Sequence, residues 1–348
     1  MLRPISSLGV RILRQLPAES AHQLTLALLP WAERLGLLPG QAVCGVTGEV
    51  TSEAFYWQGL CFGNRVGLAA GFDKNADAVD ALAACGFGFV EIGTLTPRPQ
   101  PGNPAPRLFR LPQQGAIINR MGFNNKGVDH AVRRLHTSSS GIVKGINIGK
   151  NADTPIEQAT DDYLYCMRRV YPYADYLVAN ISSPNTRNLR SLQHGEVRNR
   201  LFAALAGERE RLAGEFDKRV PILIKIAPDI QAQAIPELVE KIVANGLDGV
   251  IAANTTTHRP KSLAGLKHAG ESGGLSGEPL KPFALATVAE VARCLPRDKL
   301  LIGAGGISSQ EDAQAFFAAG ANLVQLYTSL VYQGPGLVEK IRKIGPGV

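Results

Sequence analysis

From Val66 to the C-terminus, short apolar runs alternate with longer amphipathic stretches. This alternation is typical of repeated βα units, in which buried parallel strands are joined by helices. The eight predicted strands cover residues 66–70, 89–93, 142–148, 176–180, 222–226, 249–253, 300–303 and 323–327. Eight such units close into a barrel, and 348 residues fit one barrel with insertions. The pattern therefore predicts an α/β chain with the (β/α)8 TIM-barrel fold.

The first 40 residues do not follow this repeat. Apolar side chains recur there at helical spacing along two segments, which predicts an amphipathic helical hairpin. The apolar positions are Ile5, Leu8, Ile12, Leu13 and Leu16 in the first segment and Leu24, Leu28, Trp31 and Leu35 in the second, with turns expected at residues 18–20 and 39–40. We therefore divide the chain into a hairpin, residues 1–40, and a barrel, residues 41–348. The hairpin either packs its apolar stripe on the barrel or, because it is basic, lies among anionic lipid headgroups as a peripheral anchor.

Most of the predicted strands end in a polar or glycine-rich cluster, such as AAGFDKN, NIGKN, NISSPNT and AANTTT. In a barrel these clusters meet at the C-terminal face, where catalytic groups lie. Two longer interruptions, residues 97–122 and 256–277, are too polar and too rich in Gly and Pro to be helices of the ring. We expect them to be lids or hairpins over the barrel mouth, with the functional site beneath them.

Composition narrows the possible partners. Hydrophobic residues make up 45% of the chain and charged residues 19%, which excludes a disordered protein. The net charge of +7 suggests an anionic partner, but Lys and Arg form no run, so we expect no nucleic acid. Five cysteines without a CxxC pair and six histidines without HxxxH spacing fit neither a disulfide framework nor a metal site, so we expect a reducing compartment and no metal.

No apolar run approaches the roughly 20 residues that a membrane-spanning helix needs. The first 20 residues also lack the unbroken apolar segment of a secretory signal, although an organellar transit peptide stays open as an alternative. We therefore expect a chain that does not cross a membrane.

Two features near the strand ends suggest a phosphorylated ligand and a buried cation. Residues 303–308, GAGGIS, leave a strand and enter a helix, and residues 327–329, YTS, follow the last strand. Glycines there let backbone N–H groups approach a phosphate, although a plain tight turn would look the same. Lys225 lies inside the apolar strand ILIKIAP, where an unpaired ammonium would be costly, so it needs an anionic or electron-rich partner. A Schiff-base lysine is an equally good interpretation of this residue alone.

Amide side chains gather at the same predicted face. Lys74 and the asparagines Asn119, Asn147, Asn180, Asn185 and Asn254 lie at strand ends or on mouth loops. An amide both donates and accepts, so these side chains suit a ligand with alternating N–H and C=O groups, and the lysine suits a carboxylate. A single asparagine is more often a cap or a turn residue. The prediction depends on their number.

The strings GLAAGFDKNAD, EIGTLTPRPQPGNPAPRLFR, INRMGFNN, NIGKN, NISSPNTRNLR, IKIAPD, AANTTT, GGLSG, IGAGGI and LYTSLVY resemble those of the quinone-dependent, class 2 dihydroorotate dehydrogenases. The resemblance runs from the N-terminal hairpin to the C-terminal helix. It implies oxidation of dihydroorotate to orotate in pyrimidine synthesis, with FMN passing the electrons to a membrane quinone. Two features favour class 2: Ser183 stands where class 1 enzymes use cysteine, and the amphipathic extension contains His22.

The resemblance also assigns roles to residues. It implies that Ser183 is the catalytic base, helped by Thr186 and a water, with Phe123 shielding the site. Dihydroorotate contacts are implied at Lys74, Asn119, Arg120, Met121, Gly122, Phe123, Asn180, Asn185, Asn254 and Thr255. FMN contacts are implied at Ala70, Gly71, Phe72, Asp73, Lys74, Thr94, Asn147, Asn180, Lys225, Ala253, Gly277, Gly306, Tyr327 and Thr328, and quinone-tunnel contacts at His22 and Arg110. Lys225 would then stabilise the reduced, anionic flavin, and the Schiff-base interpretation falls away.

The resemblance implies a peripheral protein on the cytoplasmic face of a bacterial inner membrane, with an anionic lipid surface as a partner; the mitochondrial inner membrane is the alternative. Two other functions stay open. A tRNA-dihydrouridine synthase would share the flavin barrel and the basic charge but would need a further RNA-binding domain, for which we expect no room. A non-catalytic barrel that binds a phosphorylated ligand would have a polar mouth of only structural importance.

Overall fold

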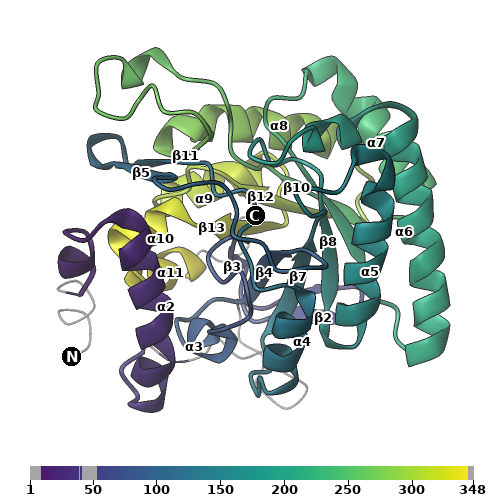
Figure 1. Cartoon of the computed structure of the whole chain (residues 1–348), viewed down its shortest axis with the longest axis horizontal. Coiled ribbons are helices and arrows are strands. Elements are labelled where there is room, and N and C mark those ends of the chain that lie inside the picture. The colour runs from purple at the N-terminus through teal and green to yellow at the C-terminus, as the bar shows by residue number, and fades with distance from the viewer. Residues whose placement is uncertain (1–8, 39, 41–52, 344–348) are drawn as a thin grey trace.

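Eight parallel strands form a closed barrel at the centre of the computed structural model, which describes residues 9–38, 40 and 53–343 (Figure 1). The strands are β3 (Val66–Leu68), β4 (Phe89–Leu95), β7 (Val143–Ile148), β8 (Tyr176–Asn180), β9 (Ile222–Ile226), β10 (Gly249–Ala252), β12 (Leu300–Ala304) and β13 (Leu323–Leu326). Each pairs with the next along the chain, and β13 pairs with β3. The predicted (β/α)8 barrel is confirmed, and every predicted strand overlaps an observed one.

Helices surround this barrel. They are α3 (Val79–Ala83), α4 (Val128–His136), α5 (Ala159–Val170), α6 (Gly195–Phe216), α7 (Ile235–Ala244), α8 (Lys281–Cys294), α9 (Gln310–Ala318), α10 (Thr328–Gln333) and α11 (Gly336–Arg342). The main core lies between the strands and these helices, where most side chains of the strands' outer faces are fully buried.

Aromatic side chains fill the barrel's N-terminal end. A short antiparallel hairpin, β1 (Phe55–Trp57) and β2 (Leu60–Phe62), places Phe62 edge-to-face on Phe89, with ring centroids 5.4 Å apart. Glycines on neighbouring strands make room for these rings, because a Cβ at Gly67 would lie 2.3 Å from the Phe89 ring. This end is therefore a packed core, and a ligand can enter the barrel only at the opposite end.

A second sheet covers part of the C-terminal end. It contains β5 (Leu108–Leu111), β6 (Ala116–Asn119) and β11 (Gly274–Gly277), paired antiparallel in the order β11-β6-β5. The first two strands come from residues 97–122 and the third from residues 256–277. The two polar interruptions are therefore hairpin elements over the mouth, as predicted, and they join into one sheet.

The N-terminal extension is helical over residues 9–13 and in α2 (Ala18–Arg34). The predicted turn at residues 18–20 is wrong, because the chain turns at residues 14–17 and α2 begins at Ala18, directly after Pro17. A proline suits this boundary because it lacks an N–H and ends the preceding helix. Ile5, Leu8 and the predicted turn at Pro39 lie outside the described residues.

The apolar stripe of α2 does not pack on the barrel. Its members are all exposed, with Leu24 at 40%, Leu28 at 52%, Trp31 at 62% and Leu35 at 69%. The face toward the barrel instead carries Ala21, which is buried, and Leu26 and Leu29, which pack against the main core. Of the two interpretations of the hairpin, packing of this stripe on the barrel is wrong.

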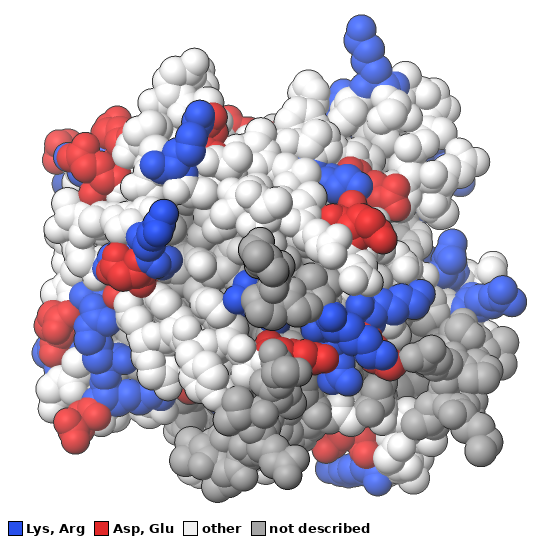
Figure 2. All heavy atoms as spheres, turned by 180° about the vertical axis from the view of Figure 1, so that it is seen from behind, with Lys and Arg blue, Asp and Glu red and all other residues white. Residues whose placement is uncertain are grey.

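Charges and cysteines partly follow the sequence-based expectations. Acidic and basic side chains are interspersed on the face shown in Figure 2. Cys85, Cys166 and Cys294 are free thiols, whereas Cys61 is disulfide-bonded, which the cysteine pattern did not predict.

Within the ranges the structure covers, no helix is long and apolar enough to cross a membrane, and no group of three or more His, Cys, Asp or Glu side chains could hold a metal ion.

Candidate active site

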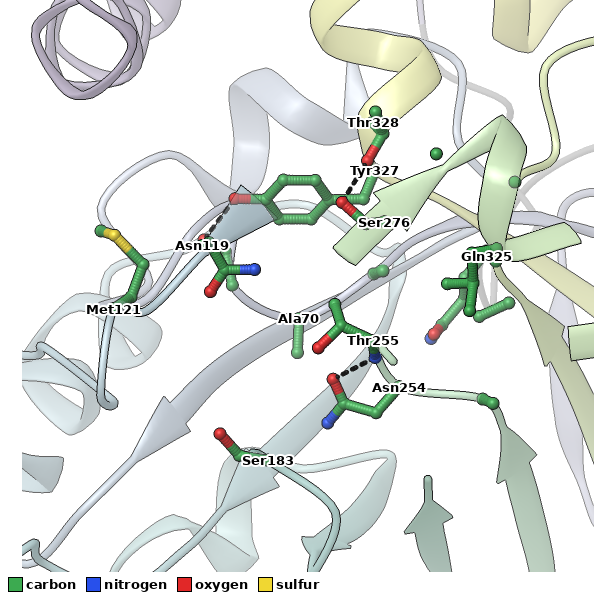
Figure 3. A pocket seen from close by; sticks show the side chains of 18 of the residues that line it. Ala70, Asn119, Met121, Ser183, Asn254, Thr255, Ser276, Gln325, Tyr327 and Thr328 are labelled. Carbon is green, nitrogen blue, oxygen red and sulfur yellow. Dashed lines mark hydrogen bonds between the residues drawn. The ribbon is translucent and has the colours of Figure 1, made fainter. Parts of the chain in front are cut away.

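A pocket that, with the open space at its mouth, takes up about 1260 Å³ opens at the C-terminal ends of the barrel strands, beneath the second sheet (Figure 3). It brings together residues that lie up to about 260 positions apart in the chain. Its lining includes these predicted site residues: Ala70, Gly71, Lys74, Thr94, Asn119, Met121, Gly122, Phe123, Asn180, Ser183, Asn185, Lys225, Ala253, Asn254, Thr255, Gly277, Gly306, Tyr327 and Thr328. The strand-end clusters therefore form one site.

Two of the predicted catalytic and cofactor residues, Asn147 and Thr186, do not line the pocket. Asn147 is fully buried beneath its floor, where its Oδ1 accepts a hydrogen bond from the Thr94 hydroxyl at 2.6 Å. Thr186 is also buried, and its Oγ1 has no hydrogen-bond partner in the protein. An unpaired buried hydroxyl is uncommon and indicates a place for a water or a ligand.

The side chains of three other predicted residues make their contacts outside this pocket. The Asp73 carboxylate accepts backbone N–H groups of Asp77 and Ala78, at 2.9 and 2.8 Å, and so holds the loop before α3. Arg120 forms an ion pair with Glu271 at 2.7 Å, away from the pocket. Phe72 lines a second pocket, described below. Contacts of Arg120 and Asp73 with a ligand in the first pocket would have to come from the backbone.

A buried ionic cluster forms the floor of the pocket. Lys225 Nζ lies 3.1 Å from Glu91 Oε1, and both side chains are buried. Glu91 also accepts hydrogen bonds from Asn147 Nδ2, at 2.7 Å, and from the Gln325 amide. The ammonium therefore has the anionic partner that we expected. We missed Glu91 itself, although a charge inside the apolar strand β4 is the same signal that singled out Lys225.

The asparagines at the mouth form an amide array of two hydrogen-bonded groups, Asn185 with Asn119 and Asn180 with Asn254. Asn185 Nδ2 donates to Asn119 Oδ1 at 3.1 Å, and Asn180 Nδ2 donates to Thr94 Oγ1 at 2.9 Å. Asn254 also accepts the N–H of Thr255, which is a turn contact of the kind that a single asparagine often makes. Figure 3 shows Asn119, Asn254 and Thr255 around the same cavity. The array leaves several amide groups facing one ligand.

The loop after β8 carries Ser183. This side chain is only 6% exposed, and its Oγ accepts the backbone N–H of Asn185 at 3.2 Å. Phe123, which also lines the pocket, has a left-handed backbone with φ of 55°. Its ring lies against Gly149 of the NIGKN motif, where a Cβ would be 3.0 Å from Phe123 Cε2. Gly149 therefore lets the aromatic ring cover the site.

Desolvation changes the pKa of Lys74, a charged residue of the pocket lining. Burial lowers the pKa of Lys74 from 10.5 to about 8, although the nearby Glu19 and Asp73 carboxylates oppose this shift. An anionic ligand beside Lys74 would restore the lost stabilisation of its ammonium form. This residue is therefore poised to bind a carboxylate.

Two polar groups of the pocket lining have no protein partner. The Ser329 hydroxyl and Asn124 Oδ1 are buried, line the pocket and have no hydrogen-bond partner. Gly306, with φ of +76°, comes so close to the chain that a Cβ would lie 2.8 Å from Gly277 O. These features fit a large polar ligand whose tail is held by backbone groups.

A second pocket of about 1110 Å³ lies between the N-terminal extension and the barrel. His22, Phe72 and Arg110 line it, and Tyr327 lines both pockets. Burial, and next the nearby Lys74, lower the pKa of His22 to about 3, so this imidazole is neutral at physiological pH. Arg110 donates to the carbonyl of Leu16, which ties the extension to the second sheet.

Known proteins resemble this chain over nearly its whole length. The family model for dihydroorotate dehydrogenase matches residues 54–344. Two proteins named dihydroorotate dehydrogenase (quinone) are similar: that of Burkholderia pseudomallei strain 668 is 51% identical over 96% of both chains, and that of Burkholderia mallei strain SAVP1 is 50% identical over 96% of this chain and 95% of its own. The structure of an Eimeria tenella DHODH in complex with ferulenol is similar with a TM-score of 0.83 and 38% identity, over 93% of this chain and 89% of that chain. A ligand-free structure of the Eimeria tenella enzyme gives a TM-score of 0.82 and 39% identity, over 92% of each chain.

Proposed function

The chain belongs to the dihydroorotate dehydrogenase family, and from this premise we propose which residues carry out the reaction. The protein oxidises dihydroorotate to orotate in pyrimidine synthesis, with FMN as prosthetic group and a quinone as electron acceptor. FMN, when bound, would supply the acceptor for the hydride of the substrate ring. What remains for the protein's own side chains is to bind the substrate, to remove its proton and to exclude water.

Ser183 is the base in this proposal. Its support is the position of a buried hydroxyl on the pocket wall, together with a second buried hydroxyl three residues further along the chain, Thr186 Oγ1, that has no protein partner. A serine is a weak base, so a water held by Thr186 would carry its proton away. The N–H of Asn185 donates to Ser183 Oγ and would stabilise negative charge as it develops there. Phe123 would keep bulk water out.

Dihydroorotate suits the amide array. Its ring carries alternating N–H and C=O groups, which the side chains of Asn119, Asn185 and Asn254 can match, and its carboxylate suits the ammonium of Lys74. The remaining contacts, at Arg120, Met121, Gly122, Asn180 and Thr255, complete the proposed substrate site. For Arg120 only a backbone contact agrees with its ion pair to Glu271.

FMN fits the rest of the pocket. The unpaired Ser329 hydroxyl and the close backbone approach at Gly277 and Gly306 suit its phosphate tail. Lys225 suits its ring, because an ammonium there stabilises the extra charge of the reduced flavin. The other proposed flavin contacts are Ala70, Gly71, Asp73, Lys74, Thr94, Asn147, Asn180, Ala253, Tyr327 and Thr328, whereas Phe72 lies nearer the second pocket.

The second pocket is the proposed site of the quinone. His22 would line it on the side of the extension, residues 1–40, and the barrel domain, residues 41–348, would supply Arg110 and Tyr327. The exposed stripe of α2 supports a peripheral position on a membrane, since its apolar side chains would lie among lipid tails and nearby arginines would meet anionic headgroups. We propose that the protein lies on the cytoplasmic face of a bacterial inner membrane.

The observation that carries the proposal is the meeting of Ser183, Lys74 and the amide array in one pocket with Lys225. Absorption spectra of the purified protein, with and without dihydroorotate and without quinone, test it. We expect a flavin spectrum that dihydroorotate bleaches. A coloured protein that dihydroorotate leaves unbleached would contradict the proposal, and bleaching only in the presence of another reductant would favour a different flavin barrel such as a tRNA-dihydrouridine synthase.

A further inference from the structure

An ion pair joins the N-terminal extension to a loop at the mouth of the barrel. Glu19, in the first turn of α2, accepts from Arg107 Nη2 at 2.6 Å and from its Nε at 3.1 and 3.2 Å. The contact is bidentate and partly shielded, because the side chains of Arg107 and Glu19 are only 14% and 23% exposed. Such a pair is geometrically specific and less screened than one on the open surface.

The other arm of the same guanidinium holds the loop of residues 101–107. Arg107 Nη1 donates to the carbonyls of Pro101, at 2.5 Å, and Asn103, at 2.8 Å. Gly102 within this loop is tightly enclosed, since a Cβ there would lie 2.2 Å from Met121 O. Because one planar group makes all these contacts, the position of Glu19 influences the shape of the loop.

The loop in turn contacts the proposed substrate site. Asn103 Nδ2 donates to the carbonyl of Arg120 at 2.9 Å and to the carbonyl of Asn185 at 3.2 Å. Asn185 donates to Asn119 and, through its backbone, to Ser183 Oγ. A continuous path of hydrogen bonds therefore runs from α2 through Arg107 and Asn103 to the loop that carries the proposed base.

We propose that Glu19 is a positioning residue for dihydroorotate: through Arg107 and Asn103, it holds Asn185 and Asn119 in the arrangement that binds the substrate. The inference rests on the proposed function, which assigns these two asparagines to dihydroorotate. It gives the extension a role in the substrate site as well as in the quinone pocket, which α2 lines with Ala18, Ala21 and His22.

The charge of Glu19 also affects Lys74, the proposed partner of the substrate carboxylate. The Glu19 carboxylate opposes the lowering of the Lys74 pKa by burial, so it favours the ammonium form that a carboxylate ligand needs. Removal of the Glu19 charge would therefore lower the pKa of Lys74 further. The binding of orotate would then begin to weaken at a lower pH than in the unaltered protein.

The test is a titration of the oxidised holoenzyme with orotate, followed by the change in the flavin spectrum. We expect Glu19→Gln to weaken orotate binding at least about fivefold, the lower end of typical coupling between sites. The alkaline limit of binding should also shift to lower pH. The KM for dihydroorotate should rise while the KM for quinone and the flavin content stay unchanged. Glu19→Asp should recover part of the loss, because it keeps the charge.

Glu33→Gln is the matched control, because it removes the same charge from the same helix and Glu33 has no ion pair among the described residues. Asn185→Ala separates the inference from its premise. Unchanged affinity in Glu19→Gln together with weakened affinity in Asn185→Ala would overturn the role of Glu19 alone, whereas unchanged affinity in both would overturn the substrate site and the inference with it. If Glu19→Gln fails to retain flavin, the same orotate titration is carried out with Arg107→Lys. This variant is suitable because lysine keeps the charge but cannot span Glu19 and both loop carbonyls.

Discussion

Tyr327 and Phe72 stand edge to face, with ring centroids 6.0 Å apart, in the wall between the two pockets. Phe72 makes a similar contact with His22 on its other side, at 5.1 Å. The three rings therefore form a continuous aromatic path from the proposed flavin site to the proposed quinone site.

Replacement of Phe72 by leucine should affect only the quinone side. We expect the KM for quinone to rise about three- to tenfold, which corresponds to the binding free energy of one or two edge-to-face ring contacts. The rate at which dihydroorotate bleaches the flavin should not change, because Phe72 does not line the first pocket. Stopped-flow measurement of the two half-reactions checks this. Phe202→Leu, a buried substitution in α6, is the control, and an equal effect there would attribute the change to general loss of packing.

Lys74 gives the substrate site a defined response to pH. Its pKa of about 8 means that the ammonium form, which attracts a carboxylate, is present below that pH and is lost above it. Orotate affinity should therefore be level below about pH 8 and then fall by up to about tenfold per pH unit. Titration of the holoenzyme with orotate from pH 6 to 10 measures this. Lys74→Arg should move the decline to higher pH, and an unmoved decline would exclude Lys74 as its cause.

The same pKa has a consequence for stability, with the sign set by the direction of the shift. Because the pKa of Lys74 is lower in the folded protein than in the unfolded chain, the unfolded chain binds more protons between about pH 8 and 10.5. The contribution of Lys74 to the stability of the ligand-free protein therefore becomes more favourable as the pH rises through this window. Urea unfolding of the flavin-free protein at several pH values would detect it, relative to Lys74→Met.

The barrel could be predicted because its strands are buried on both faces. A strand such as β9, Ile222–Ile226, is a run of apolar residues interrupted only by Lys225, and it ends where the polar cluster begins. The hairpin of β1 and β2 was missed because strands of three residues are too short to show a period. Local pattern therefore predicted the long elements and the positions of the polar loops.

Contacts across the barrel could not be predicted in the same way. Lys225 required an anionic partner, yet its identity as Glu91 depends on β4 and β9 facing each other across the barrel, which no local pattern contains. The stripe of α2 posed a similar problem, since helical periodicity identifies an apolar face but not what covers it. Only the packing of Ala21 and Leu29 toward the barrel reveals that Trp31 faces outward.

The exposed stripe of α2 leads to a prediction for lipid binding. The double variant Leu28→Ser with Trp31→Ser should bind vesicles of phosphatidylglycerol at least about tenfold more weakly, because two large apolar side chains no longer enter the lipid. Co-sedimentation with vesicles measures this. Turnover with a short, water-soluble quinone should stay the same. Tyr165→Ser, which replaces an exposed large apolar side chain in α5, is the control. Equal loss in the control, or no loss in the double variant, would contradict a membrane role for the stripe.

Ser183 gives the most direct test of the chemistry. Ser183→Ala should retain its flavin and bind orotate, because the hydroxyl is small and its main contact is the Asn185 N–H. Flavin reduction by dihydroorotate near neutral pH should slow by about 10²- to 10⁴-fold, the usual contribution of a positioned base. Anaerobic stopped-flow at a saturating substrate concentration measures this step without quinone.

Ser191 is an exposed serine in η4 (Leu189–Gln193) of the same loop, and flavin reduction in Ser191→Ala should proceed at the normal rate. Thr186→Val should fall between the two, because Ser183 would keep its position while the Thr186 hydroxyl, which we propose to hold the proton-carrying water, is removed. A Ser183→Ala protein that bleaches at the normal rate would remove this serine from the reaction and leave the amide array to bind substrate for another base.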